Sequence, residues 1–367
     1  MTTVTSASNT YSFITINDAA DPTFNQLLGI NNANTIAGYF GSGATDHPNV
    51  GYILASPNYL TNIDLANFPN ANQTQQIGIN ADGTTVGFYV DAEGNNFGFV
   101  FASGTYTTVA SPETGAGTVN QLLGLNGGYA VGFFTDETGN NHGYSYDIAT
   151  QAFADVTPPA AFACTSTTAT STNNNGDVVG FCDTDANTTI SFFANSGSYL
   201  QLNVPGSTNT QAFGININRD VVGSFVDAEG VTHGFIATGA NTATPTYQSI
   251  DHPSAVNSTI LNGINDQGYI VGFYLDAGGN TNGVLATPGG TGSTSIAPGS
   301  GIATIATSSS ASTVPASSTT TTTTTAASAT VAKVSSVSIP TGLTSGSAMN
   351  FSLFSAAILA AISVLII

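Results

Sequence analysis

The chain has 367 residues, of which 6% are charged, and its two basic residues stand against 21 acidic ones for a net charge of −19. Binding to nucleic acid or to anionic lipid head groups needs clusters of Lys and Arg, so this composition excludes both partners. Solubility must rest on Asn, Thr, Ser, Gln and Gly together with the scattered acids, a composition typical of secreted or wall-exposed proteins.

One phrase recurs along most of the chain. Its clearest copy is GINADGTTVGFYVD at residues 78–91. Related copies begin at Gly29, Gly124, Thr170, Gly214 and Gly263. The last glycine of the phrase returns every 43 to 49 residues, at Gly38, Gly87, Gly132, Gly180, Gly223 and Gly272. A repeat of this length indicates one small unit that needs neighbours on both sides to bury its faces.

Strand-forming segments can be followed in chain order. Residues 11–16 alternate and are rich in β-branched side chains, which predicts a strand ahead of the first copy. Each copy then predicts four short strands, of the types QLLGLN, VVGFY, HGF and TYTTV. The strands are apolar on both faces, so each sheet should be covered on both sides.

Turn residues separate the first two strands of a copy. The pattern is Asn-x-x-Gly, as at 80–83, where Asn bonds its own backbone and Gly supplies a positive φ. Arg219 takes the glycine position in the fifth copy, which predicts a locally altered turn there. The second and third strands are joined by short loops that open with an aspartate, such as DAEGN.

The two ends of the repeat array predict a closed ring. The sixth copy stops after its third strand, at 282–286, whereas a spare strand lies at 11–16. Pairing the spare strand with the last sheet would remove an exposed edge. We therefore predict an all-β fold: a monomeric six-bladed β-propeller over residues 10–287, closed by an N-terminal strand.

The repeat phrase also resembles a known family. GINxxGxxVGFYxDxxG followed by HGF or HGY, best seen at 124–144 and 214–235, resembles the extracellular HAF repeat family. The resemblance covers nearly all of residues 20–287 and implies a propeller-like, exported protein without established chemistry. The first and fourth copies depart most, since they lack the aligned Asp-x-x-Gly and His-Gly elements.

The chain after the repeats predicts a stalk and an anchor. Residues 288–340 consist mainly of Ser, Thr, Ala and Gly, a composition typical of a disordered, O-glycosylated stalk or of a plain disordered linker. An uncharged apolar run follows at 351–367. Segment 341–367 therefore predicts a GPI-anchor signal with attachment at Ser345, and a retained tail anchor is the alternative.

Cysteines and glycosylation sequons fit a secretory route. Cys164 and Cys182 either form a disulfide in an oxidising compartment or remain two buried thiols. Because they lack the ligand spacing of a zinc site, we predict no metal, and we predict no cofactor either. N-glycosylation sequons begin at Asn72, Asn187 and Asn257. Residues 1–9 have neither the basic nor the apolar region of a leader, so secretion requires a leader ahead of Met1.

Loops on one face form the candidate binding surface. In a propeller, the loops between the second and third strands emerge beside the links from blade to blade. The acids and histidines in these segments are Asp91, Asp136, His142, Asp227, His233, His252 and Asp276. They predict a polar binding face, and ordinary turn chemistry is the competing interpretation. The asparagines that open the first turn of every copy indicate structure rather than catalysis.

Known catalytic patterns are missing. One arginine is too few for a sialidase-like site, and Glu93, Glu137 and Glu229 recur in matching loops instead of forming an acid–base pair. No G-x-S-x-G element or phosphate-binding loop occurs. We predict a non-catalytic extracellular protein that is held on a cell surface or cell wall by its C-terminal anchor and acts in adhesion or in recognition of a glycan or protein. The alternatives are a carbohydrate-active enzyme that uses loop carboxylates and a purely structural coat module.

Overall fold

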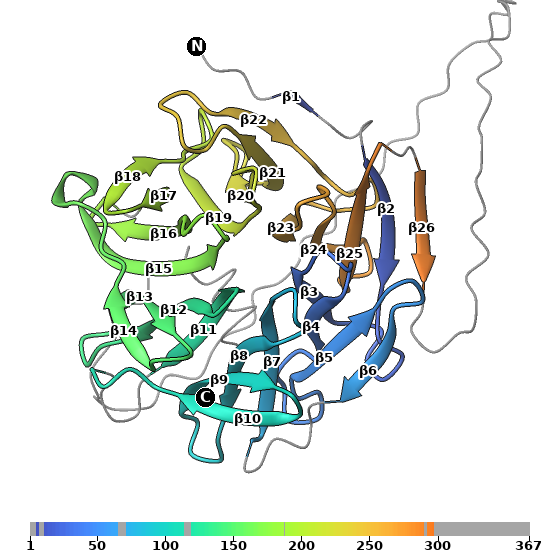
Figure 1. Cartoon of the computed structure of the whole chain (residues 1–367). Helices are drawn as coiled ribbons and strands as arrows, with labels where there is room; N and C mark the ends of the chain where they lie inside the picture. Colours follow the sequence, from blue (N-terminus) through green and yellow to red (C-terminus); the bar gives the residue numbers. More distant parts are fainter. Residues whose placement is uncertain are drawn as a thin grey trace, which may run out of the picture.

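The computed structural model describes residues 5–6, 11–64, 71–113, 119–186, 188–289 and 292–296. Within these ranges the chain forms 26 β-strands and a single 3-10 helix, Ala160–Phe162. Six units of four antiparallel strands surround a central axis, which is the arrangement of a β-propeller (Figure 1). The predicted all-β propeller is therefore confirmed.

Each of the first three blades runs outward from its innermost strand. Blade one contains β3 (Asn25–Ile30), β4 (Ile36–Phe40), β5 (Val50–Ala55) and β6 (Leu60–Asp64). Blade two contains β7 (Gln73–Ile79), β8 (Thr85–Val90), β9 (Asn96–Ala102) and β10 (Thr105–Val109). Blade three contains β11 (Asn120–Asn126), β12 (Tyr129–Thr135), β13 (Asn141–Asp147) and β14 (Ala152–Asp155).

The other three blades follow the same plan, except that the last borrows its outer strand. Blade four contains β15 (Cys164–Thr172), β16 (Val178–Thr184), β17 (Thr189–Asn195) and β18 (Ser198–Gln201). Blade five contains β19 (Asn209–Ile215), β20 (Val221–Val226), β21 (Thr232–Thr238) and β22 (Thr246–Ser249). Blade six contains β23 (Thr259–Ile264), β24 (Ile270–Leu275), β25 (Thr281–Pro288) and β2 (Tyr11–Ile16).

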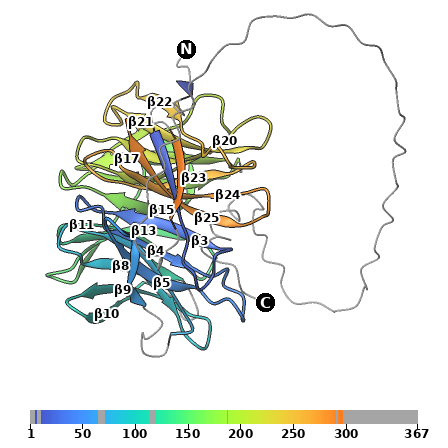
Figure 2. The same ribbon diagram turned by 90° about the vertical axis from the view of Figure 1, so that its right-hand side faces the viewer.

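The N-terminal strand closes the ring. β2 pairs antiparallel with β25, with Tyr11 opposite Pro288 and Thr15 opposite Val284. Figure 2 shows the closure from the side, where the blue strand lies against orange β25. The side chain of Phe13 packs in the same core as Val284 and is 3% exposed. The closure predicted from the spare strand is confirmed.

Short strands outside the predicted ring extend two blades. β26 (Gly292–Ile296) pairs parallel with the outer side of β2, and β1 (Thr5–Ser6) pairs parallel with β22 of blade five. β26 lies inside the segment predicted as stalk, so the ordered sheet continues past the expected boundary at 287. Its Ser and Thr residues suggest disorder by composition, but the free edge of β2 offers a full row of backbone partners. The rest of the stalk lies outside the described residues.

Apolar side chains fill the space between neighbouring blades. One core cluster joins Val86, Val100 and Val109 of blade two to Leu122 and Tyr144 of blade three. Leu122 is completely buried and Tyr144 is 1% exposed. Burial of both faces of each sheet explains why the strands read as nearly continuous apolar runs.

Glycines in the innermost strands let the blades meet around the axis. A Cβ on Gly29 would lie 2.3 Å from the carbonyl oxygen of Ile77 in blade two. A Cβ on Gly263 would lie 2.8 Å from the carbonyl oxygen of Leu28, across the junction that closes the ring. Only a residue without a side chain tolerates such close backbone contact.

The asparagines that open the first turn also tie the blades together. Asn80 Oδ1 accepts the backbone N–H groups of Asp82 and Thr84, each at 3.0 Å. Its Nδ2 donates to the carbonyl of Gly127 in the next blade at 2.9 Å. Matching bonds between blades run from Asn31 to Asn80, Asn173 to Asn216, Asn216 to Asn265 and Asn265 to Asn31. The turn role was predicted from the sequence, and the ring of contacts between blades was not.

Replacing Asn80 with alanine is expected to destabilise the propeller by about 1–3 kcal/mol, because it leaves buried turn groups without partners. The matched control is Asn126→Ala. Asn126 has the same repeat position, but it pairs directly with Tyr129 across a shorter turn, and among the described residues its side chain makes no bond to blade four. Urea unfolding of both variants measures the difference, and equal midpoints would contradict a stabilising role for the asparagine ring.

Candidate functional site

The predicted aspartates and histidines of the loops bond to one another. Asp136 Oδ1 accepts the backbone N–H groups of Thr138 and Asn140 at 2.8 and 3.0 Å, and its Oδ2 lies 2.8 Å from Nε2 of His142. Blade five repeats this arrangement, with Asp227 Oδ2 3.0 Å from Nε2 of His233. In blade six Asn282 takes the histidine position and donates to Asp276 Oδ2 at 3.0 Å.

Each of these histidines also stacks on an aromatic ring. His142 lies over Phe134 with ring centroids 5.0 Å apart, and His233 lies over Phe225 at 5.2 Å. These pairs face each other across adjacent strands. His252 reaches blade six from the link before β23 and covers Tyr274 with a centroid distance of 3.7 Å. The histidines therefore have packing partners inside the fold.

Hydrogen bonds keep the loop carboxylates ionised. The hydrogen bond from His142 is the largest cause that lowers the pKa of Asp136. For Asp227 and Asp276 the largest cause of a lowered pKa is a backbone N–H bond, from Val231 and Asn280 respectively. A carboxylate held in this way is a poor proton donor near neutral pH.

The loop residues stay in separate blades as turn-forming pairs. Asp91, for example, bonds the backbone of its own loop, accepting the N–H groups of Glu93 and Asn95 at 3.0 and 2.8 Å. Among the described residues, no group of three or more His, Cys, Asp or Glu is placed to hold a metal ion. Their local bonds fit the turn interpretation, and their role in binding stays a prediction.

A disulfide joins Cys164 at the start of β15 to Cys182 in β16. Of the two alternatives that the sequence left open, the structure has the bonded pair. Cys182 occupies the strand position where blades three and five carry the aromatic residues Phe134 and Phe225. Blade four has no aligned Asp–His pair. Its disulfide stands at the place where blades three and five have a histidine ring stacked on a phenylalanine ring.

Some predicted processing sites can be placed on the fold. Asn72 and Asn257 are both exposed, the first beside the start of β7 and the second in the link before β23. Asn187 and Ser345 lie outside the described residues, as does the apolar run at 351–367. In the part of the chain that the structure describes, no helix has the length and hydrophobicity to cross a membrane.

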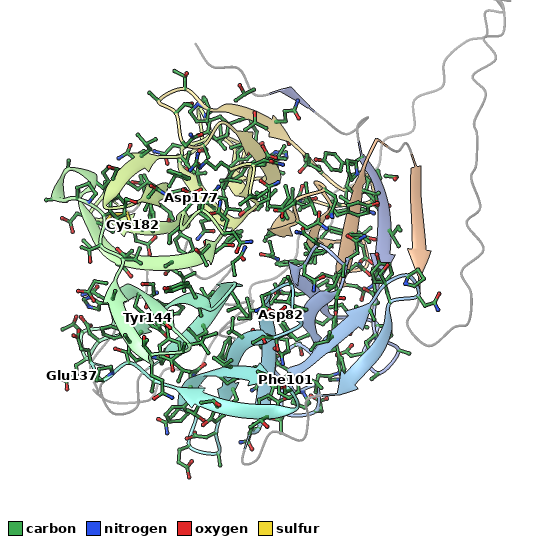
Figure 3. All side chains as sticks on the ribbon, viewed as in Figure 1. Asp82, Phe101, Glu137, Tyr144, Asp177 and Cys182 are labelled. Carbon is green, nitrogen blue, oxygen red and sulfur yellow. A yellow bond between two sulfur atoms is a disulfide. The ribbon has the colours of Figure 1, made fainter. Side chains whose placement is uncertain are left out.

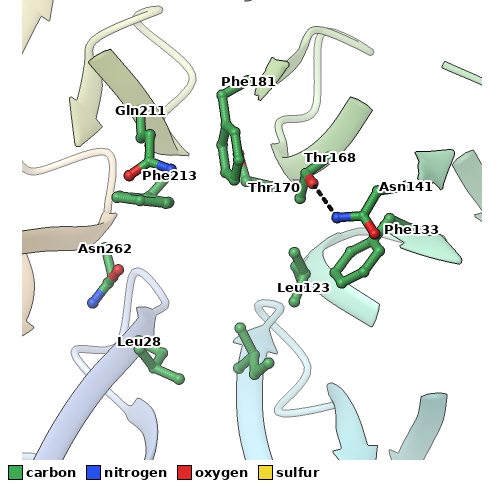
Figure 4. Close-up of a pocket in the computed structure, with 11 residues that line it drawn as sticks. Leu28, Leu123, Phe133, Asn141, Thr168, Thr170, Phe181, Gln211, Phe213 and Asn262 are labelled. Carbon is green, nitrogen blue, oxygen red and sulfur yellow. Dashed lines mark hydrogen bonds between the residues drawn. The ribbon is translucent and has the colours of Figure 1, made fainter. Parts of the chain in front are cut away.

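A feature that the sequence did not reveal lines the central axis. The innermost strand of every blade contains a β-bulge, at which one residue has no partner in the ladder. The six bulged residues are Leu28, Ile77, Leu123, Thr170, Phe213 and Asn262. All six border a cavity in the middle of the ring (Figure 4).

This central cavity has a volume of about 60 Å³ and lies on the loop side of the bulges. Its walls are completed by side chains from blades three, four and five, namely Phe133, Asn141, Thr168, Phe181 and Gln211. On the turn side of the bulges a second, more polar cavity of about 100 Å³ is bordered by the asparagine turns. All six bulged residues border both cavities, so the two cavities together follow the axis of the propeller.

The walls of the central cavity differ from one side to the other. Blades one, two and three contribute the apolar residues Leu28, Ile77 and Leu123. Blades five and six contribute Phe213 flanked by the amides of Gln211 and Asn262 (Figure 4). None of the described residues that line the cavity carries a charge.

Hydrogen-bonding capacity in the cavity is concentrated in two amides. Among the described residues, the side chain of Gln211 makes no hydrogen bond. Asn262 makes one long bond, from Nδ2 to the carbonyl of Leu27 at 3.5 Å. By contrast, the Thr170 hydroxyl is occupied by the carbonyl of Ala212 at 2.8 Å. Gln211 and Asn262 are therefore the groups best able to bond a ligand.

The sequence marks the place of the bulge without showing that a bulge forms there. The bulged residue stands directly before the glycine of the innermost strand, as Leu123 does in QLLGLN. This position varies from Leu to Phe, Thr and Asn, while its glycine neighbour is replaced only by Ser171 in the fourth copy. The position before it varies as well, as Leu27, Gln76 and Ala212 show, so variation alone would not have singled out the residues that line the cavity.

Comparisons with known proteins find likeness of fold only. No protein-family model and no curated protein matches the chain. A mutant of Aleuria aurantia lectin in complex with alpha-methyl-L-fucoside matches with a TM-score of 0.45 and 10% identity, over 81% of this chain and 97% of that chain. TolB from Acinetobacter baumannii matches with a TM-score of 0.45 and 12% identity, over 70% of this chain, which spans 64% of TolB. At these scores the matches carry no argument about ligand or activity.

Proposed function

We propose that this propeller is a non-catalytic recognition protein that binds a neutral glycan at the loop-side mouth of its central channel. The observation that carries the proposal is the central cavity, in which aromatic and aliphatic side chains stand beside the amides of Gln211 and Asn262. Binding sites are typically apolar with a few polar groups that fix the orientation of the ligand.

Carbohydrates suit this mixture of groups. A sugar carries apolar C–H groups that contact side chains such as Phe133, Phe181 and Phe213, and polar groups that bond to amides. The uncharged lining favours a neutral ligand, since a buried charge without a partner is costly. The net charge of −19, from 21 acidic and two basic residues, disfavours anionic sugars further.

The loop carboxylates support binding over hydrolysis. A glycosidase needs one carboxyl group that is protonated near neutral pH and a second that is free to act as base or nucleophile. Asp136 and Asp227 instead have lowered pKa values and accept several hydrogen bonds each. The exposed acids of the same loops, Glu137 and Glu229, lie in different blades.

Display on a cell surface belongs to the same proposal. The HAF-like repeat phrase, the disulfide and the Ser/Thr-rich segment after β26 all fit an exported protein on a stalk, with a GPI signal or tail anchor at 341–367. The propeller would then expose its central cavity to glycans around the cell. Its role would be recognition or adhesion.

Full-length protein on an array of neutral, sialylated and sulfated glycans is expected to bind neutral members. Leu123→Phe should abolish that binding, because a ring in place of Leu123 fills much of a cavity of about 60 Å³. The variant should fold normally, since blade five already carries Phe213 at this bulge. Gln201→Leu, at an exposed position on the outer strand β18, is the control. Absence of any glycan binding, or binding that Leu123→Phe leaves unchanged, would overturn the proposal.

A further inference from the structure

The size of the central cavity limits which part of a glycan can enter it, and the following inference rests on the proposed function. Pockets that enclose a whole ligand usually measure roughly 300–1,000 Å³. The central cavity measures about 60 Å³. A sugar ring must therefore stay at the mouth while a single substituent enters.

The chemistry of the walls excludes most substituents. A carboxylate, sulfate or ammonium group would be buried without a counter-charge, since no described lining residue is charged. A hydroxyl group would leave the apolar surface of Leu28, Ile77 and Leu123 unfilled. A purely aliphatic group would cover the amides of Gln211 and Asn262 without bonding them, which costs the desolvation of both.

We propose that the cavity binds the acetamido group of an N-acetylated amino sugar. Its methyl group is small and apolar and would contact Leu28, Ile77 and Leu123. Its carbonyl oxygen and N–H group are one acceptor and one donor, the partners that the side-chain amides of Gln211 and Asn262 require. No other common neutral sugar substituent combines a methyl group with an amide.

The position of Gln211 supports a ligand-binding role. The same repeat position in blades one to three carries Gln26, Gln75 and Gln121, which are 1%, 1% and 0% exposed and do not border the cavity. Gln211 is only half-buried and borders it. Asn262 stands at the bulge where blades one and three carry leucine, so a polar group has replaced an apolar one at the cavity wall.

The test compares two ligands that differ mainly in this substituent. Calorimetric titration of the full-length protein with chitotriose, a trimer of N-acetylglucosamine, is expected to show binding. Cellotriose, which has a hydroxyl group in place of each acetamido group, and the de-acetylated trimer, which has an ammonium group, should both bind at least about tenfold more weakly, since a lost hydrogen bond and an unfilled pocket are each worth about that factor.

Variants with precedents inside the chain test the two amides. Asn262→Leu copies the bulges of blades one and three, and Gln211→Ile copies Ile260 at the same position of blade six. Each should weaken chitotriose binding about tenfold. Gln201→Leu, at an exposed position on β18, should leave it unchanged.

The possible results separate this inference from the proposed function. If cellotriose binds as tightly as chitotriose, or if both amide variants bind chitotriose normally while Leu123→Phe abolishes binding, the acetamido assignment fails and the glycan site stands. If neither trimer binds and the array is also negative, both fail. Selective binding of chitotriose that depends on Gln211 and Asn262 supports both.

Discussion

Replacing Arg219 with glycine is expected to lower the stability of the propeller, even though glycine is the residue that matching turns carry at this position. Arg219 adopts a φ of +65°, in the region that favours glycine, so the substitution relieves strain in the backbone. Its guanidinium, however, bonds the completely buried carboxylate of Asp177 in blade four, with Nε 2.8 Å from Oδ2. Losing that partner outweighs the relief.

Asp177 lies at the centre of a network between blades four and five (Figure 3). Asn195 and Asn173 also donate to it, at 2.6 and 2.9 Å. Burial raises the pKa of Asp177, but the bonds from Arg219 and the two asparagines outweigh burial and lower it overall. An ionised carboxylate stripped of its cation in this place is the costly species.

Urea unfolding measures the effect of Arg219→Gly, and Asp220→Asn is the matched control. Asp220 is the neighbouring acid of the same turn and accepts one side-chain bond, from Asn216 at 3.1 Å. Its substitution should cost less than about 1 kcal/mol. If Arg219→Gly is as stable as the parent protein, the stabilisation by the ion pair does no more than offset the backbone strain at Arg219.

Arg219 also shows where sequence patterns stop being informative. The missing glycine predicted an altered turn, and this prediction is wrong: Arg219 N donates to Asn216 O at 3.1 Å, much as Gly83 N donates to Asn80 O at 3.2 Å. The backbone geometry is kept because tertiary contacts of the side chain compensate for the positive φ. A single sequence does not show which distant carboxylate provides that compensation.

The parts of the fold that were predicted depend on local chemistry repeated many times. Turn residues, apolar strands and a spare first strand are all visible in the sequence, and they led to the ring closed by β2. The central cavity depends instead on where a bulge rotates one side chain toward the axis, as at Leu123 and Asn262. A bulge adds no residue type of its own, so the strand pattern conceals it.

The predicted loop site was inferred from residue types, and its role in binding stays a prediction. Asp136 and His142 were predicted to belong to a binding face because acids and histidines often bind ligands or catalyse reactions. In the structure they satisfy a turn and cover an aromatic ring. Their recurrence in several blades reflects a repeated structural need. Gln211 and Asn262 differ from that pattern, because in blades one to three no residue at the same repeat positions borders the cavity with an amide side chain.

Acidification from pH 6.5 to 4 is expected to destabilise the propeller by up to about 3 kcal/mol through His252 alone. His252 is 3% exposed, and burial lowers its pKa from 6.5 to about 4. The unfolded chain therefore binds a proton in this range that the folded protein excludes, so stability falls as the pH falls. The ring stacks on Tyr274 and meets Phe13 of the closing strand β2 at 5.2 Å, so the loss should loosen the closure of the ring.

Other groups act outside this pH range or with opposite sign. Burial lowers the pKa of His233, but its bonds to Asp251 and Asp227 outweigh burial and raise it, so its contribution is complete below pH 6.5 and is lost as the pH rises. Asp136 and Asp227 have lowered pKa values, so their contributions are lost only as the pH falls below about 4. The interval between these limits isolates His252.

Urea midpoints at pH 6.5, 5.5 and 4.5 test the prediction in the parent protein and in His252→Phe. Phenylalanine keeps the ring over Tyr274 and cannot take up a proton, although it loses the bond from Ser254 N to His252 Nδ1 at 3.2 Å. Its stability at neutral pH will therefore be lower, but its midpoint should change little over this interval. A pH dependence that is the same in both proteins would show that another group controls the acid response of the closure.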